Sequence, residues 1–503
     1  MTSTRIAIPG RESSGGHLWP RWLFLRALGL IFFSAFYSLA FQIHGLIGER
    51  GILPAGPYLD QVAAGLGPLE RYWYAPTVLW LGAGDLGLRI VVGAGLICSV
   101  LLVLNLRPRL MVGLSTVLFL SCIGVLQDFS SYQSDGMLLE TGFISLFLAP
   151  HGTRPGLGAD DSPSRFSRFM LEWEWFRIYF ESGVGKLMSG DPHWRNLTAM
   201  DQYYQNGPLP SWIGWYVQHF PHWYHAGTVV FTLLVEVVLV WAVFGSRPVR
   251  IACFTIVTAL QIGIIATANY AFLNYLVLAL GVLLLDDRAL ERFGLPFVPA
   301  SPRPETRRTS IRRVVEGGVL GVVFYATLVA FFAGGSGSVL ALPERFLGPF
   351  RIANAYGLFG LMTDERYEIE FQGSSDGRTW IPYPFRYKPQ DVRERPGFFA
   401  PYQPRFDWNL WFASLGPWTE SPWVVAAEER LVEGSPSVLS LFRRDPFNRK
   451  PPRMVRTVLW QYWFTDFATM RATGIWWRRQ EIGPFAPPVV RGIDGKVVVG
   501  ARP

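Results

Sequence analysis

The chain contains few of the residues on which redox and metal chemistry depend. Among its 503 residues there are only three cysteines, Cys98, Cys122 and Cys253, and each lies in an apolar run. This placement excludes a CxxC redox motif and a disulfide bond in the hydrophilic C-terminal part. The sequence also lacks a Walker loop, a dinucleotide fingerprint, a zincin motif and a nucleophile elbow. We therefore expect no cofactor and no bound metal ion.

Lysine is scarce as well. Only four of the 46 basic residues are lysines, namely Lys186, Lys388, Lys450 and Lys496. Such a bias is typical of a GC-rich genome and indicates a bacterial source. Lys186 is the only lysine in the first 387 residues, and it lies at the end of an apolar helical pattern.

Charged residues make up only 17% of the chain, whereas 50% of it is hydrophobic and 15% is aromatic. This balance is too apolar for an ordinary soluble enzyme, and the chain is too long for one domain. We therefore expect a polytopic membrane protein with a soluble appendage. The net charge of +8 lies mainly in the predicted cytoplasmic loops, so we exclude nucleic acid as a partner and expect contact with membrane lipid.

The first two thirds of the chain hold a series of apolar runs, each close to the ~20 residues that cross a bilayer as a helix. A polar tail, residues 1–21, precedes the first run, which has no small-residue cleavage site and is expected to stay as an anchor. Residues 136–150 are short for a span, and could be tilted, re-entrant or extended by their flanks. We predict about nine spans: 22–47, 86–105, 110–126, 136–150, 169–188, 226–244, 249–267, 269–285 and 315–340.

Arginine placement predicts the orientation of these spans. The predicted inner segments are rich in arginine, whereas the outer loops before the last span hold only Arg50, Arg71 and Arg195. Because positive charge collects on the cytoplasmic side, we expect a cytoplasmic N-terminus and a C-terminal domain outside the cytoplasm.

Outside the spans, we expect structure in two outer loops and in the C-terminal part. Residues 49–85 suit a short interfacial helix with an aromatic belt, and residues 189–225 are either an interfacial anchor or the lined entrance to a site. The membrane domain is then 22–340, the extracytoplasmic domain 341–490 and the tail 491–503.

The C-terminal domain has a β-rich pattern. Residues 367–387 alternate apolar and polar side chains on both sides of an SSDG turn, which predicts a β-hairpin. MVRTVLWQYWF, residues 454–464, reads as a strand. DWNLWFASL is expected to form a short helix capped by Asp407, and VVAAEERLVEG a helix ended by Gly434. We predict a β-sandwich-like fold with inserted helices.

Three segments carry a family resemblance: YQSDGMLLETGFISLFLAP (132–150), HWRNLTAMDQYYQNGPLP (193–210), and FQGSSDGRTWIPYPFRYKPQD followed by PYQPRFDWNLWFASLG. Together they resemble the lipase maturation factor family, over nearly the whole chain. The resemblance implies a membrane protein whose outer domain assists folding and assembly of secreted, lipase-like client proteins. Its relatives lie in the endoplasmic reticulum membrane; a bacterial member would lie in the plasma membrane. Within these segments we take as candidate binding residues Asp135, Trp194, Arg195, Asp201, Tyr204, Arg405, Asp407, Trp408 and Trp411.

A second resemblance is local. YFESGVGKL, residues 179–187, followed by an aspartate and a tryptophan, is similar to a helix in the membrane domain of vitamin K-dependent gamma-carboxylase. That resemblance implies that Lys186 aligns with a lysine that serves as a catalytic base, although Gly185 stands where that family has a second lysine.

The run from 172 to 186 places several charges inside a predicted span. At 100° per residue, Glu174, Arg177 and Glu181 share one face, so we expect structural ion pairs among them. An ionised group at the bilayer centre costs at least ~2.5 kcal/mol, so this helix should lie inside the bundle. Lys186 is either a snorkelling or paired residue or a base of lowered pKa. Its possible partners are Glu140, Glu172, Asp191 and Glu236.

Three functions follow. The first is a maturation factor that binds a client with its exported domain, through the PYQPRFDWNLWF segment; deleting 345–503 should then abolish client rescue and leave a stable bundle. The second is a membrane enzyme that uses Lys186 as a base on a lipid or quinone-like substrate, which Lys186→Arg would inactivate. The third is a structural scaffold, with a dry, fully packed bundle.

Overall fold

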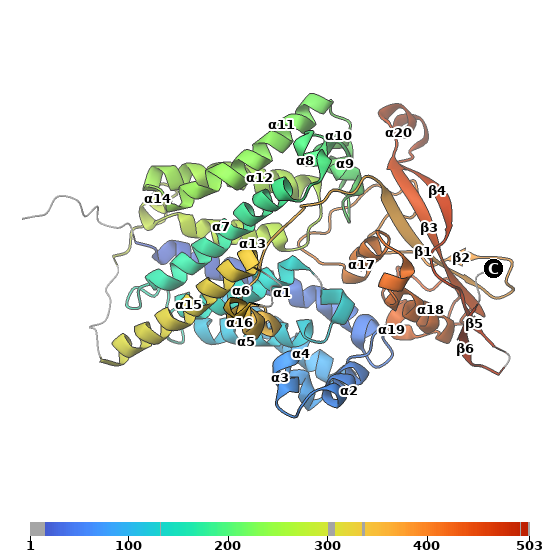
Figure 1. Cartoon of the computed structure of the whole chain (residues 1–503), viewed down its shortest axis with the longest axis horizontal. Coiled ribbons are helices and arrows are strands. Elements are labelled where there is room, and N and C mark those ends of the chain that lie inside the picture. Colours follow the sequence, from blue (N-terminus) through green and yellow to red (C-terminus); the bar gives the residue numbers. More distant parts are fainter. Residues whose placement is uncertain (1–15, 131, 300–306, 334–337, 493, 501–503) are drawn as a thin grey trace, which may run out of the picture.

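The computed structural model describes residues 16–130, 132–299, 307–333, 338–492 and 494–500. A helical part, drawn from blue to yellow in Figure 1, is followed by a part built on a β-sheet, drawn in orange and red. Most of the predicted N-terminal tail, residues 1–15, lies outside the described residues.

The helical part contains a helix at each of the nine predicted ranges, with shorter helices between them. In chain order it comprises α1 (Leu18–Ile47), α2 (Ala55–Gly65), α3 (Glu70–Tyr74), η1 (Val78–Leu81), α4 (Asp85–Val103), α5 (Pro108–Ile123), η2 (Gln127–Ser130), α6 (Gln133–Leu148), α7 (Arg165–Met188), α8 (Pro192–Arg195), α9 (Ala199–Asn206), α10 (Trp212–Gln218), α11 (His222–Leu233), η3 (Leu234–Val238), η4 (Leu239–Phe244), α12 (Arg247–Thr267), α13 (Leu273–Gly281), η5 (Val282–Leu284), α14 (Asp287–Glu291), α15 (Arg307–Ala333), η6 (Val339–Ala341), α16 (Leu342–Leu347) and η7 (Gly348–Phe350).

Among the described residues, five helical segments are long and apolar enough to cross a membrane: Leu18–Ile47, Asp85–Val103, His222–Phe244, Arg247–Thr267 and Ser310–Phe332. The helices Pro108–Ile123 and Leu273–Leu284 are apolar but shorter. The chain is thus a membrane protein by its apolar helices, whereas the count of nine spans stays a prediction.

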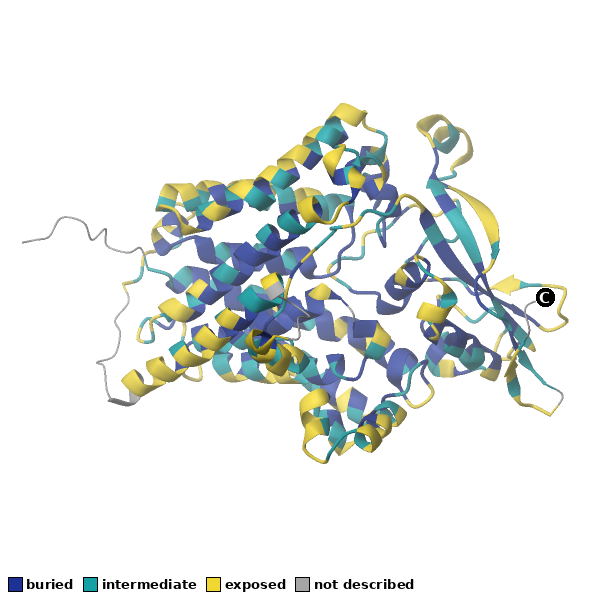
Figure 2. Ribbon diagram, in the orientation of Figure 1, coloured by how far each residue is buried: buried dark blue, intermediate teal, exposed yellow. Residues whose placement is uncertain are grey.

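Helix α1 lies in the interior of the helical part and packs most extensively against α4. Gly95 on α4 makes this approach possible, because a Cβ atom there would lie 2.3 Å from the Phe36 ring of α1. Small residues permit such close helix contacts in membrane proteins. Figure 2 shows the result, with buried residues on α1 and exposed residues on the outer faces of α11, α12 and α15.

Both loops that were predicted to lie on the outer side contain helices. In 49–85, the aromatic residues Tyr72, Trp73 and Tyr74 of α3 are exposed as an interfacial belt would be, and the Trp73 ring lies 3.9 Å from that of Phe346. In 189–225, by contrast, Trp194 and Trp215 are buried. These two tryptophans therefore act in packing and not as surface anchors.

The C-terminal part has one antiparallel sheet, with helices inserted between its strands. It comprises β1 (Arg366–Ser374), β2 (Ile381–Pro382), α17 (Arg405–Ala413), η8 (Trp418–Glu420), α18 (Trp423–Glu433), α19 (Pro436–Leu439), β3 (Met454–Phe464), α20 (Phe467–Thr473), β4 (Trp477–Pro484), β5 (Val489–Arg491) and β6 (Val497–Val499). The strand order is β2-β1-β3-β5-β6, and β4 also pairs with β3. β1 and β3 run in register from Arg366 opposite Tyr462 to Ser374 opposite Met454.

The predicted sandwich is therefore wrong, because the second layer is made of helices. Buried side chains of α17 and α18, such as Phe406 and Leu431, join the same core as Ile369 and Phe371 of β1. These helices bury the apolar face of the sheet, so no second sheet is needed. The predicted tail is also corrected: Val497–Val499 forms β6 and pairs with β5.

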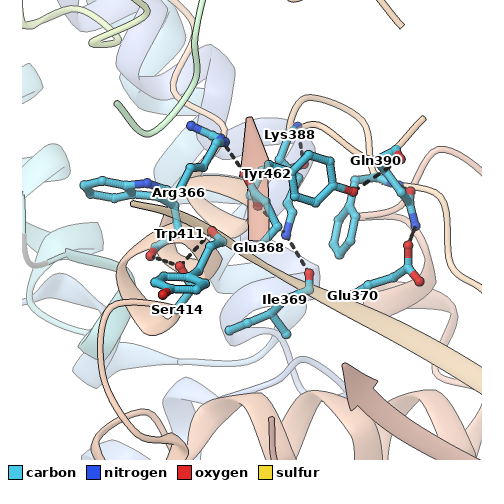
Figure 3. Close-up of polar contacts among 12 residues, drawn as sticks. Arg366, Glu368, Ile369, Glu370, Lys388, Gln390, Trp411, Ser414 and Tyr462 are labelled. Atoms are coloured by element: carbon cyan, nitrogen blue, oxygen red, sulfur yellow. Dashed lines mark hydrogen bonds and ion pairs between the residues drawn. The ribbon is translucent and has the colours of Figure 1, made fainter. Parts of the chain in front are cut away.

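The other face of the sheet carries a polar network (Figure 3). Lys388 Nζ lies 2.8 Å from Glu368 Oε2 and donates to the Ile369 carbonyl at 2.5 Å, while Glu368 also pairs with Arg366. Gln390 donates to Glu370 at 3.1 Å, and its carbonyl accepts from Tyr462. These contacts fasten the segment after β2 across β1.

Local predictions in this part succeeded where the pattern was periodic. The hairpin is confirmed, although β2 has only two residues, and the strand 454–464 coincides with β3. Gly434 ends α18 in the left-handed conformation. Asp407, however, is not a helix cap: α17 begins at Arg405, and the Asp407 carboxylate accepts from the backbone N–H groups of Tyr387 and Lys388 instead.

Candidate functional site

The polar residues of α7 gather around one irregular segment of the chain. Residues 351–364, which we call the strap, join η7 to β1 and have no regular helix or strand. A backbone of this kind within a membrane-embedded protein needs partners for its N–H and C=O groups. Side chains of α6, α7 and the 189–206 segment supply them.

Arg177 and Glu140 form the centre of this arrangement. Both side chains are at most 1% exposed, and they are paired with each other. Arg177 also donates to the Asn354 carbonyl at 2.5 Å. Glu140 Oε2 accepts from the Asn354 backbone at 3.1 Å, the Asn354 amide at 2.9 Å and the Tyr356 hydroxyl at 2.9 Å. One buried ion pair thus holds the first half of the strap.

The next turn of α7 holds the middle of the strap. Glu181 Oε2 accepts from the Tyr356 backbone N–H at 2.6 Å, and Ser182 Oγ accepts from that of Leu358 at 3.1 Å. Arg177 lies 3.8 Å from Glu181, whereas Glu174 accepts a hydrogen bond from Thr141 at 2.7 Å. Arg177 therefore pairs mainly with Glu140 of α6. Of the two predicted partners within α7, Glu181 lies near Arg177, whereas Glu174 is bound by Thr141.

Lys186 lies one turn further along α7 and contacts both the strap and Glu236, which lies on η3. Its Nζ donates to Glu236 Oε2 at 2.8 Å and Oε1 at 3.0 Å, and to the Leu358 carbonyl at 2.9 Å. The other three proposed partners of Lys186 are engaged elsewhere: Glu140 and Asp191 accept hydrogen bonds from the strap, and Glu172 pairs with Arg168. Gly183 allows the approach of the two helices, since a Cβ there would lie 2.8 Å from that of Glu236.

Glu236 stands on a π-helical stretch, η3, that interrupts the helix between α11 and η4. Such interruptions occur frequently at functional sites. A cavity of about 310 Å³, which we call the lateral cavity, opens beside the Lys186–Glu236 pair. Its lining comes from α7, α8, α9, α11, η3, α12 and the strap, and includes Trp194, Tyr203, Tyr204, Phe231, Gly263 and Phe359.

The 189–206 segment binds the end of the strap. Asp191 caps α8 through the His193 N–H at 2.8 Å and also accepts from the Met362 N–H at 2.6 Å. Trp194 donates to the Phe359 carbonyl at 3.1 Å, and Asn206 to that of Thr363 at 2.6 Å. Trp194 and Asp191 thus have a structural role, because they hold the strap by hydrogen bonds to its backbone.

Two further arginines connect the sheet-containing part to the helices. Arg405 of α17 makes a bidentate pair with Asp135 of α6, at 2.7 and 2.8 Å, and both side chains are 0% exposed. Arg366, at the start of β1, donates to the carbonyls of Gln205, Gly207 and Pro208. Because buried pairs are costly to break, these contacts fix how the two parts meet.

The remaining candidate binding residues are dispersed. Arg195 is exposed, and Asp201 lies 3.0 Å from His222. Tyr204 lines the lateral cavity. Trp408 and Trp411 are 6% and 8% exposed and belong to the core. The PYQPRFDWNLWF segment is therefore mainly an internal contact, and on α17 the large side chain open to a client is Phe412.

Burial raises the pKa of the Asp407 carboxyl to about 6, although its two backbone N–H partners favour the charged form. A carboxyl whose pKa is raised on folding binds its proton more tightly in the folded state. Its contribution to stability is therefore present at pH 4 and is lost as the pH rises through 6.

We expect Asp407→Asn to weaken the pH dependence of stability. Asparagine still accepts the two N–H bonds but does not titrate, so at pH 7 the variant should be more stable than the natural chain by up to about 3 kcal/mol. Thermal unfolding midpoints of the purified protein between pH 4.5 and 7 measure this. Asp376→Asn is the control, because its backbone hydrogen bonds lower its pKa to about 2, below this window. Equal pH profiles for Asp407→Asn and the natural chain would contradict the prediction.

Sequence reasoning missed several residues of the site. Asn354 and Tyr356 lie in a segment without periodicity, and Arg366 reads as an ordinary strand residue. Gln42, in the first apolar run, was also missed, and it donates to the carbonyl of Gln403. The available signal was that a polar amide in an apolar run needs a partner. Within the described part of the chain, no group of three or more His, Cys, Asp or Glu side chains could hold a metal ion.

These features define a class of protein: a membrane helical domain to which an α+β domain is joined by a hydrogen-bonded strap and buried arginine pairs. Residues 19–292 match the family model of the lipase maturation factor transmembrane domain, and residues 352–487 match that of the lipase maturation factor C-terminal domain. The chain therefore belongs to the lipase maturation factor family. The second match begins at the strap.

Named relatives agree with this assignment. The chain is 32% identical to lipase maturation factor 2 of Rattus norvegicus, over 94% of this chain and 83% of the relative. It is 32% identical to lipase maturation factor 1 of Bos taurus, over 96% of this chain and 91% of the relative. For lipase maturation factor 1 of Homo sapiens the identity is 31%, over 96% and 91%. No solved structure matches the chain.

Proposed function

We propose that this protein assists the folding and assembly of secreted lipase-like clients, with its α+β domain outside the cytoplasm. Membership of the family over both parts of the chain is the observation that carries the proposal. The arginine-rich inner loops support nine spans and a cytoplasmic N-terminus. The membrane domain is then 22–340, and the outer domain begins at 341, includes the strap and extends to β6.

The outward side of the sheet offers a surface for the client. Arg456 of β3 lies over the Trp380 ring at 4.1 Å, and Arg479 of β4 over the Trp460 ring at 4.1 Å. All four side chains are partly or fully accessible. Tryptophan and arginine dominate binding energy at protein interfaces, because they bury large areas and keep polar contacts.

A secretion assay tests the proposal. In cells without their own lipase maturation factors, the full chain should raise the activity of a co-expressed secreted lipase. Trp380→Ala with Arg456→Ala should lower that activity about tenfold, as expected for ~1.4 kcal/mol of lost client binding. Arg478→Ala is the control, because Arg478 is exposed on the same strand as Arg479 but points to the opposite side of the sheet. Equal lipase activity with and without the chain would overturn the proposal.

A further inference from the structure

The lateral cavity opens toward the bilayer. Phe231, Ala259 and Gly263 are exposed and line it on α11 and α12. These helices belong to segments that are long and apolar enough to span a membrane. In the most apolar stretch of each segment, only 28% and 17% of the residues, respectively, are buried. The large unburied surface of both helices is what hydrocarbon would cover. A ligand can therefore enter sideways from the membrane.

The polar end of the cavity carries no net charge. Lys186 is 2% exposed and Glu236 is 12% exposed, and their charged groups are in direct contact. A charged ligand head would leave one ion without compensation in a medium of low dielectric constant, which is strongly unfavourable. The site therefore suits an uncharged head.

The hydrogen-bonding capacity that remains is that of an acceptor. The three ammonium hydrogens of Lys186 are used by the two Glu236 oxygens and the Leu358 carbonyl. An ionised carboxylate has about four lone-pair sites. Across the residues that the structure describes, Glu236 accepts hydrogen bonds only from Lys186. A fitting ligand thus supplies a donor, and a hydroxyl group is an uncharged donor that many membrane lipids carry.

We propose that the lateral cavity binds an uncharged amphiphile whose hydroxyl head donates to Glu236 and whose hydrocarbon chain leaves between α11 and α12. Its volume of about 310 Å³ is at the lower end of small-molecule sites. It therefore holds the head and the start of a chain, and the remainder extends into the bilayer. Tyr203, Tyr204 and Trp194 form aromatic walls near the head. This lipid site is separate from client binding and does not depend on it.

Photolabelling of the full chain tests the position of the site. A monoacylglycerol with a diazirine in its acyl chain should label residues 222–244 or 247–267, as mapped by mass spectrometry. Gly263→Trp should lower labelling about tenfold, because the indole occupies the mouth. Gly93→Trp on α4 is the matched control, since a Cβ at either glycine meets no atom within 4 Å. Labelling that is confined to other helices, or equal in the two variants, would overturn the proposal.

Competition tests the head. Unlabelled monoacylglycerol should compete at least about tenfold better than the methyl ester of the same fatty acid, which has no donor. The double substitution Lys186→Met with Glu236→Leu keeps the interior neutral and should abolish this preference. If that variant does not fold, the comparison of the two competitors on the natural chain still decides. Equal competition by the two lipids there would overturn the assignment of a hydroxyl head.

Discussion

Arg405→Met is expected to destabilise the protein by about 3–5 kcal/mol, because it leaves Asp135 as an uncompensated charge in a fully buried position. Arg405 also donates to the Phe129 carbonyl at 2.8 Å, which would lose its partner. The change should appear as a lower thermal unfolding midpoint of the purified chain and as a smaller amount of protein in the membrane.

Asp135→Leu combined with Arg405→Met is the matched comparison. Replacement of a buried ion pair by apolar side chains of similar volume is often neutral, since both desolvation costs disappear together. We expect the double variant to recover most of the stability that Arg405→Met loses. If the double variant is no better than the single one, the cost lies in packing and not in the unpaired charge.

The second large effect is expected on the stability of the helical part when the chain is truncated before or after the strap. A chain that ends at Phe350 loses the whole strap, so Glu181, Ser182 and Lys186 each lose a strap partner. A deletion that includes the strap, such as that of residues 345–503, should therefore not leave a stable bundle, contrary to the expectation from the sequence. We expect a chain that ends at Asp364 to be clearly more stable, because it retains these bonds.

Both truncated chains should also carry Asp135→Asn, because neither contains Arg405 and Asp135 would otherwise be a buried charge without its partner. Monodisperse elution in detergent and the thermal midpoint measure the difference. A chain ending at Phe350 that unfolds at the same temperature as the one ending at Asp364 would show that the strap contributes nothing to the helical part.

Much of the secondary structure followed from hydropathy and periodicity. Each predicted span overlaps a helix within the described residues, and the strand 454–464 coincides with β3, because apolar runs and alternation act within one segment. The sandwich was wrong for a different reason. Strand patterns show that one face of a sheet is covered, but they do not show whether helices or strands cover it.

The candidate site followed the same division. The sequence indicated that α7 is interior, that Lys186 needs a carboxylate and that Glu236 was one option. It did not indicate that Glu140 is the main partner of Arg177, because the two are 37 positions apart and lie on different helices. Nor did it place Asn354 and Tyr356 against α7.

By itself the sequence determined the membrane class, the family, the positions of the long apolar helices and of strands β1 and β3, and the presence of buried charges that require partners. These depend on local composition and on runs of residues along the chain. Only the tertiary structure decided which partners those charges have: Asp135 with Arg405, Glu140 and Arg177 with the strap, and Lys186 with Glu236 beside a cavity. A buried charge requires an opposite charge or a hydrogen bond nearby, and several residues meet that need equally well until the chain folds.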